Sequence, residues 1–170
     1  MKIKDRTEFK NKPPVMTFSA TDKVIKAVHA MSEKNYGASV VVDSDNRPIG
    51  IVTERDFMRR LLDKGLDANT TAIDAIMTKD LRLARVNDDV VDWLRIMSNE
   101  RFRHLPVVDE QGHLLNLMSQ GDFVSYTWPQ LLNQVKESVQ KSFAERYALY
   151  LILGGIMVYS IAMIIVMRNI

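Results

Sequence analysis

The sequence contains a tandem repeat with a constant spacing between its two copies. The segment Gly50–Asp56 recurs as Asn116–Asp122, and we call the spacing that relates position 50 to position 116 the repeat offset. Nine positions between Asp22 and Phe57 are identical to their equivalents in the second copy, and the apolar residues follow the same spacing in both. A repeat of this kind predicts two similar supersecondary units that bury their apolar faces against each other. Since there are two copies, we expect a closed pair rather than an open array.

A second constraint lies near the end of the sequence, where positions 147–167 form a long run without a charge. A helix of this length reaches about 31 Å, close to the roughly 30 Å thickness of a bilayer's hydrocarbon core. The run therefore predicts a single transmembrane helix, followed by a short tail of residues 168–170. More basic residues precede the run than follow it, so we expect the preceding domain to face the cytoplasm.

Composition excludes several classes of function. The formal net charge is +2, and basic residues alternate with acidic ones, so we expect no nucleic-acid partner. Cysteine is absent and the three histidines lack the spacing of metal ligands, so we expect no metal site. No nucleophile, base and orienting group can be assembled from the motifs, so we expect no catalytic residues and no enzyme.

Each copy has the pattern helix, strand, strand, helix, with a short strand before it. Thr21 and Asn87 are the expected N-caps of the first helices, because apolar residues at helical spacing follow them. The valine-rich segments 39–42 and 105–108 predict core strands. The segments 49–52 and 115–118 predict the return strands, and a hydroxyl residue after each predicts the cap of a second helix.

These patterns divide the sequence into consecutive segments. The expected boundaries are an irregular N-terminal segment of residues 1–12, a first repeat of residues 13–68, a second repeat of residues 69–127, and residues 128–146. Apolar residues recur at helical spacing within 128–146, which predicts an amphipathic connector helix leading to the transmembrane run.

Three motifs together resemble those of a cystathionine β-synthase domain pair, also called a CBS pair or Bateman module. They are Gly-x-x-Thr-x-x-Asp at 50–56, His-Leu-Pro-Val-Val-Asp at 104–109, and Ile-Met-Thr at 76–78. The resemblance implies an α/β fold of two β-α-β-β-α units packed by their sheets, with two ligand clefts. It also implies a homodimer and a non-enzymatic regulatory module that senses an adenosine nucleotide such as AMP, ADP or ATP, with no required cofactor.

The resemblance assigns a ligand role to each matching motif. Asp56 and Asp122 would accept hydrogen bonds from the ribose hydroxyls of a nucleotide. Thr53 and Ser119 begin helices whose free amides suit a phosphate. The purely structural alternative is that each Thr or Ser forms a capping box with its Asp.

We expect the remaining ligand contacts around the core strands. Arg103 and His104 could supply positive charge to the phosphate of the second repeat, or they could be solvated. Ala38 would offer its backbone to the adenine edge, and Val52 or Met118 would contact the adenine face. The first repeat has no cation at the positions of Arg103 and His104, so we expect at most one well-occupied nucleotide site, in the second repeat.

The sequence thus supports two functions, and the family resemblance also implies a third, a regulator of divalent cations or of transport. The first is a membrane-anchored module that binds an adenosine nucleotide and transmits its occupancy to a membrane or cytoplasmic partner. The alternative is a membrane-tethered dimerisation scaffold without a small-molecule ligand.

Overall fold

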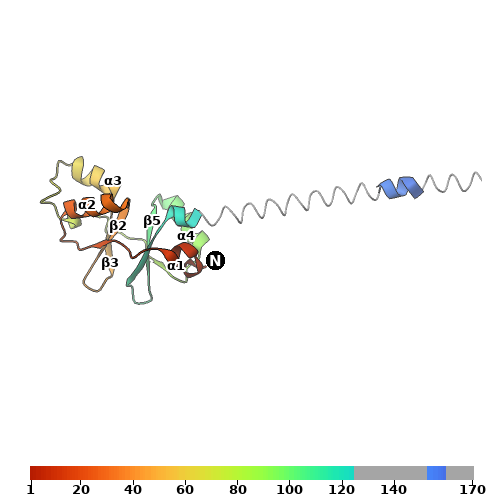
Figure 1. Cartoon of the computed structure of the whole chain (residues 1–170), viewed down its shortest axis with the longest axis horizontal. Helices are drawn as coiled ribbons and strands as arrows, with labels where there is room; N and C mark the ends of the chain where they lie inside the picture. The colour runs from red at the N-terminus through yellow and green to blue at the C-terminus, as the bar shows by residue number, and fades with distance from the viewer. Residues whose placement is uncertain (125–152, 160–170) are drawn as a thin grey trace, which may run out of the picture. The chain divides into compact units, whose positions relative to one another are not determined.

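The computed structural model describes residues 1–124 and 153–159 (Figure 1). The chain divides into two compact units, Met1–Val124 and Ser125–Ile170, and the first unit contains the first repeat and the second repeat as far as Val124. The expected connector helix, most of the expected transmembrane run and the tail lie outside the described residues. Residues 153–159 are helical. In the described parts of the chain, no helix has the length and apolar character needed to cross a bilayer.

Each repeat forms a three-stranded sheet with the same topology. The first sheet has the order β1 (Thr17–Phe18), β2 (Ala38–Val42), β3 (Pro48–Thr53). The second has the order β4 (Ala84–Arg85), β5 (His104–Val108), β6 (Leu114–Ser119). In both sheets the first strand is parallel to the second, and the second is antiparallel to the third. The four predicted core and return strands are confirmed to within one residue at each end.

The register of the two sheets preserves the repeat offset. Val41 pairs with Gly50 in the first sheet, and Val107 pairs with Asn116 in the second. A bulge follows immediately in both sheets, before Val42 and before Val108. A bulge is a specified feature of a strand pair, so its presence in both copies shows that the repeat extends to backbone detail.

One long helix covers each sheet, and these helices are α2 (Val24–Lys34) and α4 (Val90–Glu100). Their apolar sides pack into two separate cores, each of which includes a valine of the central strand, Val41 or Val107. Trp93 of α4 is partly buried against the second core, and its indole N–H donates to Asp88 Oδ2 at 2.9 Å.

The expected caps of α2 and α4 were wrong by two residues. Helix α2 follows Lys23, which makes no side-chain cap, and α4 is capped by Asp89, whose Oδ1 accepts from Val91 N at 2.8 Å. Thr21 lies outside the helix because the chain turns there, with Asp22 Oδ2 accepting from Ser19 N at 2.9 Å. Thr21 and Asn87 therefore lie in turns closed by Asp22 and Asp88, which accept from Ser19 N and Arg85 N, rather than at the helix caps.

The second helix of the first repeat is short and irregular. Helix α3 (Glu54–Asp56) continues as the π-helical segment η2 (Phe57–Leu62). In the second repeat a helix begins at Gln120, and its described part ends at Val124.

The N-terminal segment is ordered, in contrast to the irregular segment expected there. It forms η1 (Ile3–Asp5) and α1 (Thr7–Asn11), and Ile3 is completely buried in the second core. Two backbone hydrogen bonds of 3.0 Å attach η1 to the second repeat, from Ile3 N to Asp88 O and from Lys4 N to Val86 O.

The segment η3 (Ile73–Ala75) is attached to the first repeat in the same way as η1 is attached to the second. Ile73 is completely buried in the first core, although the sequence boundaries assigned it to the second repeat. Its amide donates to Asp22 O at 2.9 Å and that of Asp74 donates to Ala20 O at 3.0 Å. These two acceptors, Asp22 O and Ala20 O, occupy the same positions in the first repeat as Asp88 O and Val86 O, the acceptors used by η1, occupy in the second. Ile3 and Ile73, however, are separated by more residues than the repeat offset. The change of spacing hid this part of the repeat in the sequence.

We predict that Ile3→Ala destabilises residues 1–124 by about 2–5 kcal/mol, the usual cost of truncating a buried isoleucine. The physical cause is the loss of apolar contacts in the second core. Urea unfolding of the full chain, followed by tryptophan fluorescence, measures the change. Ile49→Ala is the matched control, because Ile49 is 36% exposed. Equal effects of the two substitutions would contradict the docking of the N-terminal segment.

Candidate ligand clefts

Both expected capping boxes are present, and the ribose contacts of Asp56 and Asp122 stay a prediction. Asp56 Oδ2 accepts from Thr53 N at 2.9 Å and from Thr53 Oγ1 at 2.6 Å, while Asp56 N donates to Thr53 Oγ1 at 3.3 Å. Ser119 and Asp122 repeat this pattern, with distances of 2.6, 2.8 and 3.3 Å. The boxes hold both carboxylates at the ends of the return strands.

A cleft of about 830 Å³ lies at the end of β3, beside Thr53 and Asp56, and we call it the first cleft. A second cleft of about 400 Å³ lies beside Ser119 at the end of β6. Each cleft is lined by residues of both repeats. The first cleft takes Arg101 to His104 from the second repeat, and the second cleft takes Asn35 to Ala38 from the first.

This crossed arrangement corrects the expected grouping of site residues. Arg103 lines the cleft of Thr53 and Asp56, not that of Ser119 and Asp122. Ala38 lines the second cleft, and His104 borders both. Because the two sheets contact each other through β2 and β6, the start of each central strand reaches the return strand of the other repeat. The cationic cleft is therefore the first one.

The first cleft contains more arginine than the sequence analysis assigned to it. Arg55, Arg59, Arg101 and Arg103 all line it with exposed side chains. Among the described residues, no ion pair involves any of these four guanidinium groups. The signal missed in the sequence was the four-residue spacing of Arg55 and Arg59, which places them on one side of the segment after Thr53.

Arg60 is the fifth arginine of the first cleft, and it does have partners. Its Nη1 lies 3.4 Å from Asp56 Oδ1 and donates to Ile76 O at 2.8 Å and to Thr78 Oγ1 at 3.1 Å. The side chain is 44% exposed. Arg60 thus lies beside the candidate ribose carboxylate at ion-pair distance.

The apolar walls differ from the expected ones by one position. Val52 and Met118 are completely buried in the cores, so neither can contact an adenine. Their neighbours Ile51 and Leu117 line the first and second clefts instead. Successive side chains of a strand point to opposite faces, so an error of one residue exchanges core and cleft.

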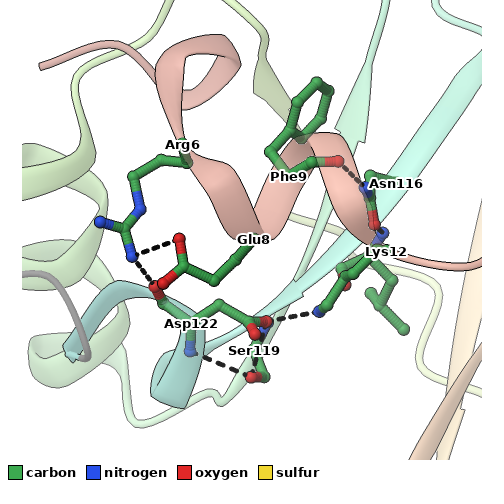
Figure 2. A network of polar contacts seen from close by, with 8 residues as sticks. Arg6, Glu8, Phe9, Lys12, Asn116, Ser119 and Asp122 are labelled. Carbon is green, nitrogen blue, oxygen red and sulfur yellow. Dashed lines mark hydrogen bonds and ion pairs between the residues drawn. The ribbon is translucent and has the colours of Figure 1, made fainter.

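Asp122 contacts the N-terminal segment, as Figure 2 shows. Lys12 forms a hydrogen-bonded ion pair with the Asp122 carboxylate, and Arg6 donates to the backbone carbonyl of Asp122. Burial opposes ionisation of Asp122, but hydrogen bonds from Lys12 and Ser119 outweigh it and hold the pKa of this carboxyl below its usual value. Lys12 is a cleft residue that the sequence analysis did not single out.

His104 was expected as a possible cation, but its surroundings favour the neutral ring. Burial lowers the pKa of His104, and the positive charges of Lys12 and Arg103 lower it further, against the opposing effects of Glu54 and Asp122. At neutral pH the imidazole can therefore offer a hydrogen bond to a ligand, whereas the charge in the first cleft comes from arginine.

A family model of the CBS domain matches residues 8–63 and again residues 73–128. The two matches cover more than half of the chain, so the protein belongs to the CBS domain family, as a tandem pair. CBS domain pairs are regulatory modules that often bind nucleotides.

Similar proteins agree with this assignment. A protein with CBS domains from Burkholderia ambifaria is 36% identical, with a TM-score of 0.65 over 70% of this chain and 89% of its own. A mitochondrial CBS domain-containing protein of Arabidopsis thaliana is 35% identical over 61% of this chain and 52% of its own length. The chain spans between 52% and 64% of the first curated relatives it matches.

A third similar structure is a CBS domain pair solved in complex with 5′-methylthioadenosine and S-adenosyl-L-methionine. It has a TM-score of 0.65 over 76% of this chain and 98% of its own, at 21% identity. At this identity the likeness shows the fold.

We predict that the structure loses stability as the pH falls from 7 to 5, in part through His104. The folded state lowers the pKa of this ring, so the unfolded chain binds its proton first, and protonation then favours unfolding. Melting temperatures measured at several pH values should show a smaller acid loss for His104→Gln than for the wild type. His29→Gln is the control, since His29 is exposed. An unchanged slope in His104→Gln would contradict the prediction.

Proposed function

We propose that the protein is a non-enzymatic regulatory module that binds an adenosine-containing nucleotide in the first cleft. The observation that carries this proposal is the group of four arginines, Arg55, Arg59, Arg101 and Arg103, which face one cleft without an ion pair to any described residue. Guanidinium groups bind phosphate through paired N–H donors, and a cluster of them attracts a multiply charged anion.

The ribose would bind at Asp56. Its Oδ2 atom is used by the capping box, whereas Oδ1 faces Arg60 at 3.4 Å. A ribose hydroxyl can donate to Oδ1, and Arg60 can turn toward the phosphate because its side chain is 44% exposed. The capping box would thus hold the carboxylate in place for the ligand at no further cost in side-chain entropy.

The adenine would lie against apolar and aromatic groups of the same cleft. Ile51 and Phe102 both line it and are both partly exposed. An aromatic ring can stack on any nucleic-acid base, because every base has a planar π-face, so Phe102 suits a purine. His104, held neutral, can exchange a hydrogen bond with the adenine edge. The adenosine ligands of the similar CBS pair support this ligand class.

Ligand binding would act on a partner by favouring one arrangement of the CBS pair over another. Since each cleft is lined by both repeats, a nucleotide in the first cleft contacts both of them. Such a ligand stabilises the arrangement in which its two sets of contacts are made together. We propose that a homodimer transmits this change to a membrane or cytoplasmic partner.

The second candidate is a ligand-free scaffold tethered to the membrane. It is favoured by one observation, that both candidate ribose carboxylates already have cationic partners within the protein, Arg60 for Asp56 and Lys12 for Asp122. In this role the clefts would hold the repeats together through their own side chains.

We predict that Arg103→Gln and Asp56→Asn each weaken nucleotide binding at least about tenfold, because each removes a charged hydrogen-bond partner of the ligand. Equilibrium dialysis of the full chain against labelled AMP, ADP, ATP, NAD and S-adenosylmethionine in turn measures affinity. The matched control is Arg95→Gln, on the exposed side of α4, outside both clefts.

The outcomes separate the two candidates. Saturable binding of one ligand, lost in the two cleft variants and kept in the control, supports the sensor. If a chain that unfolds cooperatively binds none of the five ligands, the result supports the scaffold.

We further propose that residues 147–167 anchor the protein in a membrane, on the strength of their uncharged run of membrane-spanning length. The full chain should then stay with membranes after extraction at alkaline pH, whereas a chain ending at residue 146 should be released. Release of the full chain under the same conditions would refute the anchor, and leave the ligand proposal unaffected.

A further inference from the structure

The two clefts differ at one position in a way that changes their surroundings. Gly50 on β3 and Asn116 on β6 are equivalent under the repeat offset. A Cβ atom on Gly50 would lie 2.4 Å from Met77 Sδ, so a larger residue at position 50 would force the Met77 side chain to move. The backbone of Thr78 then pairs with Ile51, through hydrogen bonds of 2.9 and 3.0 Å.

The second repeat has Asn116 in place of this glycine, and Asn116 makes side-chain hydrogen bonds there. Its side-chain amide donates to Phe9 O at 2.9 Å, and its Oδ1 accepts from Leu117 N at 2.8 Å (Figure 2). The Leu117 amide, which corresponds to the Ile51 amide, is therefore already bonded. The N-terminal segment is attached to β6 through side chains instead of through a backbone bridge.

Lys12 takes the place of the missing bridge. It corresponds to Thr78 in the repeat, and its ammonium group donates to Leu117 O at 2.7 Å, where Thr78 uses its backbone amide on Ile51 O. The same ammonium group is hydrogen-bonded to the Asp122 carboxylate. The Lys12 and Asp122 side chains are 27% and 18% exposed, so solvent screens this pair only in part.

The cation beside Asp56 is held differently. Arg60 is attached mainly to Ile76 O and Thr78 Oγ1, and it approaches Asp56 Oδ1 at 3.4 Å, where no hydrogen bond is formed. Lys12, by contrast, donates directly to the Asp122 oxygen that also accepts from Ser119. Asp122 is consequently the more strongly engaged of the two carboxylates.

We propose that Lys12 is a specificity-determining residue that excludes a nucleotide from the second cleft, and thereby makes the two clefts of this protein unequal. The proposal rests on the proposed function, since it assumes that a CBS-pair aspartate accepts the ribose. A ribose diol that donates to Asp122 competes with the Lys12 ammonium group for this carboxylate, and replacing that group exchanges a charged hydrogen bond for neutral ones. The second cleft also has about half the volume of the first, 400 against 830 Å³.

The test is the stoichiometry of ATP binding to the full chain, measured by equilibrium dialysis with labelled ATP. We expect one equivalent of ATP for the wild type and two for Lys12→Thr. This substitution introduces the residue type that the first cleft has at the equivalent position, Thr78. The new site should bind at least about tenfold more tightly than any second site of the wild type. Lys10→Thr on the exposed side of α1 is the matched control and should bind one equivalent.

Two further variants keep the outcomes distinct. Lys12→Met retains the aliphatic stem and replaces Lys12→Thr if that chain fails to unfold cooperatively. Asp56→Asn should remove the wild-type equivalent, and in combination with Lys12→Thr it should leave one equivalent, at the second cleft.

The proposal is overturned if the wild type binds two equivalents, or if folded Lys12→Thr and Lys12→Met each bind one. In those cases a loss of binding in Asp56→Asn still supports the proposed function. Absence of ATP binding from the wild type and from both Lys12 variants overturns this proposal. The proposed function would then depend on the other nucleotides.

Discussion

Each repeat depends on an isoleucine that lies outside the repeat's own continuous sequence. Ile73, in the segment that leads into the second repeat, is completely buried in the first core, and Ile3, in the segment that leads into the first repeat, is completely buried in the second. Small units bury too little apolar surface to be stable alone. Because each unit completes its core with the segment preceding the other, the pair is expected to fold as one cooperative structure.

This exchange of leading segments between the two repeats also determines where the ligand clefts form. The leading segments pass along the return strands, with Thr78 beside β3 and Lys12 beside β6, so each cleft lies among a return strand, a leading segment and the start of the other repeat's central strand. The positively charged side chains at the start of one central strand therefore lie beside the aspartate motif of the other repeat. This is why Arg103 accompanies Asp56, and why the first cleft is the better candidate for an anionic ligand.

Duplication produced similar clefts, and a few substitutions made them different. Beside Gly50 the leading segment forms a backbone bridge with β3, whereas Asn116 bonds to its own strand and to Phe9. In the second repeat a lysine side chain reaches β6 and Asp122 instead. The two carboxylates therefore have different cationic partners, although their motifs are equivalent in sequence.

The sequence alone determined the repeated α/β units, the strands, the two capping boxes and the CBS family, because these depend on contacts between residues close together in the chain. Apolar periodicity and the Thr-x-x-Asp and Ser-x-x-Asp spacings act within one helix or strand pair. The tertiary structure decided which residues share a cleft, since that depends on how the two sheets pack. It placed Arg103 with Asp56, and it turned Ile51 and Leu117 rather than Val52 and Met118 toward the clefts. It also decided that Lys12 pairs with Asp122, a contact between distant parts of the chain that no local pattern encodes.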